Sequence, residues 1–116
     1  MKTLDIYRHN TYNVIIRGIR YIWDENKNKT NLIKHGVVFE EAATIFSDCL
    51  YVEMHDPVHS NAEERFLAIG LSKDVRLLAV CYCASESEEM IRIISARRAT
   101  LQEAVTYTEE NNARRI

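Results

Sequence analysis

The sequence has few of the residues and patterns that mark several large classes of protein. It contains 3 glycines and 1 proline among 116 residues, too few for a collagen-like or low-complexity chain. No apolar run approaches the roughly 20 residues that a membrane-spanning helix requires, and residues 1–10 lack the basic start and apolar stretch of a signal peptide. We therefore expect a cytoplasmic protein that does not associate with membranes.

Cysteines and the common metal-binding and phosphate-binding motifs are also scarce. The 3 cysteines include Cys81 and Cys83 within an apolar run, which is typical of reduced thiols in a core. No C-x-x-C pair, glycine-rich phosphate loop or G-x-S-x-G motif occurs. A zinc site that combines these cysteines with His55 or His59 is the alternative, but cysteines two apart in a strand seldom chelate a metal alone. We predict no metal site and no cofactor.

The chain does contain enough apolar sequence for one folded domain. Hydrophobic residues make up 47% and charged residues 28% of the chain, and a domain of this length buries roughly two thirds of its unfolded surface. We assign residues 19–116 to a single domain. Residues 1–18 show no clear apolar period, and we treat them as an N-terminal extension of uncertain role.

The formal net charge of -2 conceals an uneven distribution along the chain. Residues 1–34 carry a net charge of +4, residues 35–91 carry -8, and residues 92–116 carry +2. If the two basic ends meet in space, their common surface could bind a polyanion although the whole protein is acidic. The alternative is that these like charges are simply solvated.

Hydrophobic periodicity predicts an α+β domain. A short strand over 19–23 leads into a polar helix that begins after the N-cap Asp24 and ends at Gly36. Apolar residues spaced between Phe39 and Phe46 predict a second helix. Four strands are then predicted, over 50–55, 64–70, 75–84 and 90–96, and the third of these is apolar on both faces, as a central strand would be.

A C-terminal helix completes the predicted order of elements. Thr100 and Glu103 form a capping box at its start. The predicted packing stripe consists of Leu101, Ala104, Val105 and Thr108. We therefore expect an antiparallel sheet with two N-terminal helices and one C-terminal helix. The helices would cover one face of the sheet and leave part of the other face for a concave polar site.

The first candidate functional stretch is residues 91–100, IRIISARRAT, in which a strand ends in three arginines. Guanidinium groups suit phosphate because they bind two oxygens at once and stay charged. If the strand alternates regularly, Arg92 and Arg98 face one side of the sheet and Arg97 faces the other. The alternative is that these arginines pair with nearby acidic residues.

The second candidate stretch is residues 55–65, HDPVHSNAEER, which gathers two histidines, three carboxylates and an arginine around a loop that enters a strand. Loops of this kind often carry functional sites. The candidate general bases are His55 or His59 near neutral pH, and Glu63 or Glu64 with a raised pKa. The alternative is an exposed turn with an internal pair between a glutamate and Arg65.

The third candidate stretch is the predicted helix before Gly36. Lys27 and Lys34 lie seven residues apart, hence on one helix face, and Lys34 could stabilise negative charge on a phosphoryl group. Lysines also favour helix C-termini for electrostatic reasons alone. We expect Trp23 to be a core anchor rather than a platform for base stacking.

Six short motifs occur in a fixed order within residues 21–110. They are W-D at 23–24, N-x-x-K-H-G at 31–36, F-E-E-A at 39–42, D-P-x-H-S at 56–60, E-E-R-F-x-A-I-G at 63–70, and I-R-I-I-S-A-R-R-A-T at 91–100. In this order they resemble the BrnT toxins of bacterial type II toxin–antitoxin modules. Residues 1–18 have no counterpart in the resemblance; the alternatives for them are an extension, a strand added to the sheet, or an artefact of the chosen start.

The resemblance implies a RelE-like fold and an endoribonuclease that cleaves RNA without a metal. It also implies an antitoxin partner similar to BrnA, whose DNA-binding domain would connect the toxin indirectly to operator DNA. Transferred to this sequence, the functional residues are Lys34, Glu64, Arg65, Arg92, Arg97 and Arg98. In the hypothesised mechanism the RNA 2′-OH attacks the adjacent phosphorus while Glu64 or His59 accepts its proton.

A non-catalytic function is the alternative to RNA cleavage. The same basic strand end could dock an acidic segment of a partner protein, with the acidic middle of the chain serving solubility. A homo-oligomer is compatible with both functions. A ribonuclease assay separates them.

Overall fold

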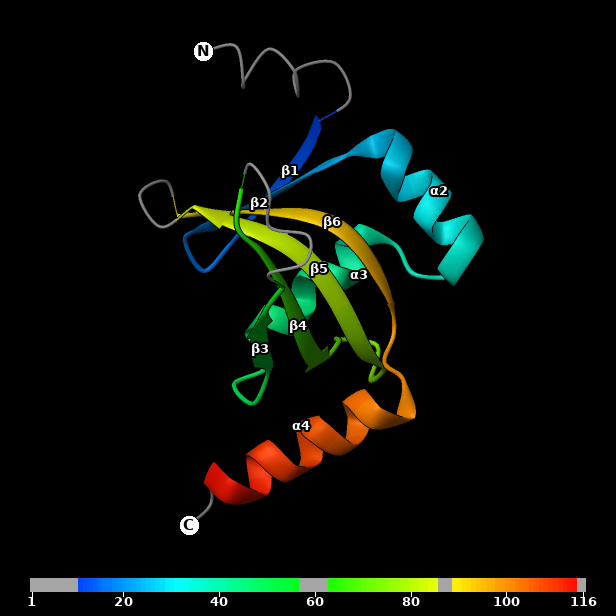
Figure 1. The fold of residues 1–116 in the computed structure, drawn as a ribbon. Helices are drawn as coiled ribbons and strands as arrows, with labels where there is room; N and C mark the ends of the chain where they lie inside the picture. The colour runs from blue at the N-terminus through cyan, green and yellow to red at the C-terminus, as the bar shows by residue number, and fades with distance from the viewer. Residues whose placement is uncertain (1–10, 57–62, 86–88, 115–116) are drawn as a thin grey trace.

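A six-stranded sheet forms the centre of the computed structural model, which describes residues 11–56, 63–85 and 89–114 (Figure 1). The strand order is β1-β2-β6-β5-β4-β3. The strands are β1 (Thr11–Ile16), β2 (Ile19–Asp24), β3 (Val52–His55), β4 (Arg65–Leu71), β5 (Leu77–Ser85) and β6 (Met90–Arg98). The helices are α2 (Glu25–His35), α3 (Phe39–Ala43), the 3-10 turn η1 (Thr44–Ser47) and α4 (Leu101–Arg114). The predicted α+β class is confirmed.

The sheet is mixed rather than antiparallel. β2 and β6 pair in parallel, with Tyr21 opposite Ile91, whereas the other neighbouring strands run antiparallel. The prediction of an antiparallel sheet is therefore wrong for this pair. Periodicity reports which face of a strand is buried, but it does not report which distant strand lies beside it.

The described chain begins with β1, the added strand that was one alternative for residues 1–18. β1 pairs with β2 along all of its 6 residues, so part of the segment that we treated as an extension adds an edge strand to the sheet. Arg17 and Gly18 connect the two strands with positive φ angles of 52° and 83°. A two-residue turn with both φ angles positive matches the twist of the flanking strands, and glycine adopts it without strain.

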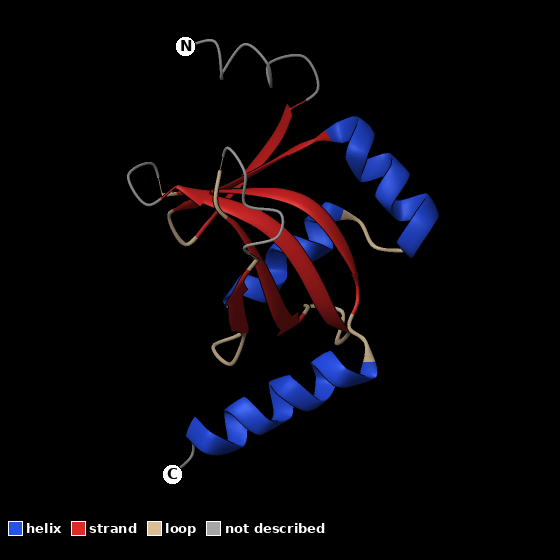
Figure 2. Ribbon diagram, viewed as in Figure 1, coloured by secondary structure: helices blue, strands red, loops and turns tan. Residues whose placement is uncertain are grey.

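Helix α2 begins and ends where the sequence predicts. The Asp24 carboxylate accepts hydrogen bonds from the backbone N–H groups of Asn26 and Lys27, and Gly36 ends the helix in the left-handed conformation with φ 70°. The second predicted helix is α3 followed by η1. Figure 2 shows α3 behind the sheet. Phe39 of α3 and Ile45 of η1 are fully buried.

The core lies between this helical layer and the sheet. Trp23 is fully buried, meets the ring of Phe39 edge-on at 6.1 Å and stacks on Tyr12 at 5.2 Å. The expected role of Trp23 as a core anchor is confirmed. β5 lies inside the sheet and contributes the buried side chains of Leu78 and Tyr82.

Helix α4 packs through a different face from the predicted one. Leu101 is 83% exposed and Val105 is 39% exposed, so the predicted apolar stripe is wrong. The helix instead contacts the connection before β3, where the Tyr107 hydroxyl donates to Asp48 at 2.7 Å and Asn111 donates to a backbone carbonyl at 3.0 Å. Polar contacts orient this helix, and apolar periodicity does not register them.

The capping box at the start of α4 is confirmed by two hydrogen bonds. Thr100 N–H donates to the Glu103 carboxylate at 2.9 Å, and Glu103 N–H donates to the Thr100 hydroxyl at 3.2 Å.

Among the described residues, no helix has the length and apolar character needed to cross a membrane.

Candidate functional site

A β-bulge in β6 decides which arginines share a face of the sheet. The register between β5 and β6 leaves Ile94 without a partner. An extra residue reverses the alternation of side chains, so Arg92 and Arg97 face the same side and Arg98 faces the other. The prediction from regular alternation, which grouped Arg92 with Arg98, is wrong for this reason.

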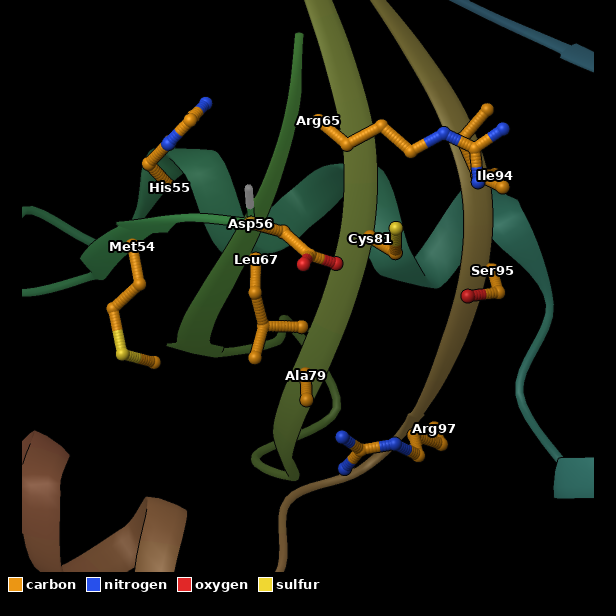
Figure 3. Close-up of a pocket in the computed structure, with 10 residues that line it drawn as sticks. All are labelled: Met54, His55, Asp56, Arg65, Leu67, Ala79, Cys81, Ile94, Ser95 and Arg97. Atoms are coloured by element: carbon orange, nitrogen blue, oxygen red, sulfur yellow. The ribbon is translucent and has the colours of Figure 1, made fainter. Parts of the chain in front are cut away.

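A hollow of about 520 Å³ lies on the face of the sheet opposite α3, which we call the open face (Figure 3). Its lining residues are Met54, His55, Asp56, Arg65, Leu67, Ala79, Cys81, Ile94, Ser95 and Arg97. Arg65 extends from β4 across β5 toward β6, and the guanidinium of Arg97 lies toward the opposite end of the hollow. The carboxylate of Asp56 and the hydroxyl of Ser95 lie between these two cations.

A second hollow of about 300 Å³ lies between α2 and β6. Lys27 and Lys34 line it from α2, as their seven-residue spacing predicts. It shares Ile94 and Ser95 with the first hollow. Lysines of α2 and arginines of β4 and β6 therefore flank the same short stretch of β6.

A buried asparagine holds α2 in this position. The Asn31 amide nitrogen donates to the carbonyls of Ala96 at 2.7 Å and Val37 at 2.8 Å, and its oxygen accepts from Ala96 N–H at 3.1 Å. These contacts fix the lysine-bearing face of the helix against β6. Sequence reasoning missed this role, because an asparagine in a polar helix gives no sign of burial.

Carboxylates pair with two of the arginines on the open face. Arg92 contacts Glu63, and its Nη2 lies 3.7 Å from the Cys83 sulfur. Arg97 binds the Glu103 carboxylate with both terminal nitrogens, at 2.7 and 2.9 Å. The alternative considered from sequence, that the arginines pair with acidic residues, therefore applies to both, although Arg97 also lines the hollow.

The electrostatics of the site fix the protonation of several groups. The hydrogen bonds from Arg97 hold the pKa of the Glu103 carboxyl below its ordinary value. Burial raises the pKa of the Cys81 and Cys83 thiols. At neutral pH Glu103 is thus ionised and both cysteines are thiols, which are poor nucleophiles.

The structure brings some of the predicted site residues together and separates others. Arg65 and Arg97 line the first hollow and Lys34 lines the second. Glu64 is exposed at the rim, where it contacts His55, a lining residue. Arg92 shares the open face without lining either of these hollows, Arg98 is exposed on the opposite side, and His59 lies outside the described residues.

Asp56 and Ser95 are lining residues to which sequence reasoning gave no role. Each belongs to a motif quoted above, and a carboxylate directly after a strand was a usable signal for Asp56. Ser95 gave no such signal in the sequence, because the bulge in β6 is what places it in the hollow.

Within the described ranges, no group of three or more His, Cys, Asp or Glu side chains is arranged to hold a metal ion.

Comparison with known proteins identifies the family. The profile of the family described as "Ribonuclease toxin, BrnT, of type II toxin-antitoxin system" matches residues 23–103. The chain belongs to the BrnT family. The crystal structure of the Brucella abortus ribonuclease toxin BrnT is 30% identical in sequence; the match covers 67% of this chain and 92% of that one, with a TM-score of 0.48. No curated protein matches the chain.

Membership has two direct consequences. BrnT proteins are ribonuclease toxins of type II modules, so RNA cleavage is the activity of the family. A type II toxin is paired with an antitoxin, so membership of the family implies an antitoxin partner.

Proposed function

We propose that this BrnT protein is an endoribonuclease that cleaves RNA by attack of the 2′-OH on the adjacent phosphorus, without a metal ion. The observation that carries the proposal is the pair of adjoining hollows, which share Ile94 and Ser95 and are lined by cationic side chains from α2, β4 and β6. One phosphodiester over this part of β6 would meet cations from both sides.

The cations supply charge stabilisation in the proposed reaction. Arg65 and Arg97 would donate to the non-bridging oxygens of a phosphate in the first hollow, and Lys34 would approach from the second. Negative charge grows on these oxygens as the phosphorus becomes five-coordinate, so fixed donors favour the transition state over the ground state.

The pair of His55 and Glu64 is our candidate for the proton acceptor. The ring nitrogen of His55 contacts the Glu64 carboxylate, so the two side chains together can accept the proton of the 2′-OH. His59 and Asp56 are the alternative acceptors. As the bond from O2′ to phosphorus forms, the bond from phosphorus to O5′ breaks and O5′ takes up a proton from the solvent. The products are a 2′,3′-cyclic phosphate and a 5′-hydroxyl, and DNA stays intact because it lacks the nucleophile.

A cleavage assay in EDTA tests the proposal. We expect purified protein to cut an RNA oligonucleotide, to leave 2′,3′-cyclic phosphate ends and to spare the all-deoxy strand. Arg65→Ala and Arg97→Ala should each lower the rate about 100-fold, whereas Arg114→Ala, an exposed arginine in the last turn of α4, should change it less than about 2-fold. Added antitoxin should stop cleavage.

Two results would contradict the proposal. Equal cleavage of RNA and of its 2′-deoxy analogue would remove the 2′-OH from the mechanism. Activity that disappears in EDTA and returns with a divalent cation would make the reaction metal-dependent. Failure to cut any RNA would favour the alternative, a module that docks an acidic partner segment in the same cationic hollow.

The same proposal extends to the protein partner and to the cellular location of this chain. We propose an antitoxin similar to BrnA that covers the cationic hollows and carries the DNA-binding domain, so that this chain reaches operator DNA only through it. RNA as substrate and a protein inhibitor as partner are consistent with action in the cytoplasm.

A further inference from the structure

Glu103 connects the start of α4 to the first hollow. Its carboxylate binds both terminal nitrogens of Arg97, and one of its oxygens also accepts the backbone N–H of Thr100 at 2.9 Å. The side chain of Glu103 is 15% exposed, against 39% for that of Arg97. The carboxylate is thus the more enclosed member of the pair, and it is held by the capping box independently of Arg97.

The bond to Glu103 uses the end of the Arg97 guanidinium and leaves its side edge available to a ligand. Nη1 and Nη2 donate to Glu103, and Nη1 also donates to the Arg98 carbonyl at 3.3 Å. Among the described residues, Nε of Arg97 donates no hydrogen bond. Nε and the second hydrogen of Nη2 form the side edge of a guanidinium, which can bind two oxygens of a phosphate at once.

We propose that Glu103 is a positioning residue that presents the side edge of Arg97 to the scissile phosphate. This inference rests on the proposed RNA cleavage. A lone arginine loses side-chain freedom when it orders on a substrate, whereas Arg97 held by a fixed carboxylate has lost that freedom on folding. The bound geometry therefore exists before RNA arrives.

The competing explanation is that Glu103 only caps α4. Two substitutions separate the roles. Glu103→Gln keeps the cap, because glutamine also occupies the third position of a capping box, but it loses the charged two-point bond to Arg97. Thr100→Ala loses the hydroxyl of the cap and keeps the carboxylate that binds Arg97.

Steady-state RNA cleavage by these variants tests the inference. We expect Glu103→Gln to lower kcat about 10-fold without raising KM, because removing a negative charge strengthens polyanion binding. Thr100→Ala should keep kcat within about 2-fold while lowering the thermal midpoint by roughly 4 °C. On an Arg97→Ala background, Glu103→Gln should change kcat by less than about 2-fold, because the group to be positioned is gone.

A kcat that Glu103→Gln leaves unchanged would overturn the inference, as would a full effect of Glu103→Gln in the absence of Arg97. A second readout keeps the test separate from RNA cleavage itself. ¹⁵N relaxation of the Arg97 Nε–H group should show a rigid side chain in the parent and Thr100→Ala proteins and an order parameter below about 0.6 in Glu103→Gln. An inactive parent protein contradicts the proposed function, whereas a mobile Arg97 in that protein contradicts the positioning role.

Discussion

At the scale of single residues, buried amides attach α2 to the rest of the molecule. Asn28 is 4% exposed and accepts the backbone N–H of Phe39 at 2.8 Å, which joins α2 to the start of α3. Asn31 is 6% exposed; its amide donates a hydrogen bond to the Ala96 carbonyl and accepts one from the Ala96 N–H. Each amide satisfies backbone groups that would otherwise be buried without partners.

We expect Asn31→Ala to lower the free energy of unfolding by about 3 kcal/mol, because it leaves the N–H and C=O of Ala96 unsatisfied in a buried setting. Urea denaturation at pH 7 measures the change. Asn26→Ala, at an exposed position of the same helix, should stay within about 0.5 kcal/mol of the parent. A loss below about 1 kcal/mol for Asn31→Ala would mean that water replaces the amide.

At the scale of elements, β6 and α4 set the shape of the site. β6 pairs with β2 on one side and β5 on the other, so it brings β2, from the basic N-terminal part of the chain, beside the strand that carries Arg92, Arg97 and Arg98. Its bulge at Ile94 turns Arg97 toward the hollow, and α4 begins three residues after β6 ends. The rim of the hollow and the first turn of α4 are consequently one continuous structure.

The packing face of α4 has a direct mutational test. Tyr107→Phe should lower the free energy of unfolding by about 1.5 kcal/mol, because it removes the hydrogen bond to the Asp48 carboxylate. Leu101→Ala should change it by less than about 0.5 kcal/mol, since that side chain is 83% exposed. Thermal unfolding of the two variants gives the comparison. A larger loss of stability for Leu101→Ala than for Tyr107→Phe would show that α4 packs through the apolar stripe predicted from sequence.

At the scale of the whole molecule, an ion pair between the buried Glu41 and the partly exposed Arg76 connects α3 to the turn between β4 and β5. Glu41 is 3% exposed; it accepts from Arg76 Nε at 2.9 Å and from the Ser72 hydroxyl at 2.7 Å. Arg76 also donates to the carbonyl of Gly36, at the end of α2, at 3.2 Å. The hydrogen bond from Arg76 lowers the pKa of Glu41 below its ordinary value of 4.5.

This ion pair predicts how the stability of the protein depends on pH. A carboxyl with a lowered pKa in the folded state contributes stability above its unfolded pKa and loses that contribution as pH falls through the folded pKa. Glu41→Gln should therefore lower the free energy of unfolding by roughly 2 kcal/mol at pH 7, and the gap from the parent should narrow as pH falls below about 4.5.

Chemical denaturation of both proteins at pH 7, 5, 4 and 3 measures this gap. Glu109→Gln, an exposed carboxyl on α4, serves as the control and should show almost no gap at any of these pH values. A gap of constant size from pH 7 to pH 3 would show that the charge of Glu41 contributes nothing and that only the shape of the side chain matters.

Local interactions determined the parts of this protein that its sequence predicts. The N-cap Asp24, the C-cap Gly36 and the capping box at Thr100 act within one helical turn, so the residues that form each end are neighbours in the chain. The strand segments and the α+β class follow from periodicity in the same way. The arginines were chosen as site candidates from their chemistry, which also needs no tertiary information.

Tertiary structure alone decided which of these residues meet. The parallel pair of β2 and β6, the bulge at Ile94 and the bond between Asn31 and Ala96 join residues far apart in the chain or depend on strand register. One extra residue in a strand reverses every later side chain, and no local pattern in the sequence marks it. The grouping of Arg92 with Arg97, and the places of Asp56 and Ser95 in the hollow, therefore depend on the packing of the whole sheet.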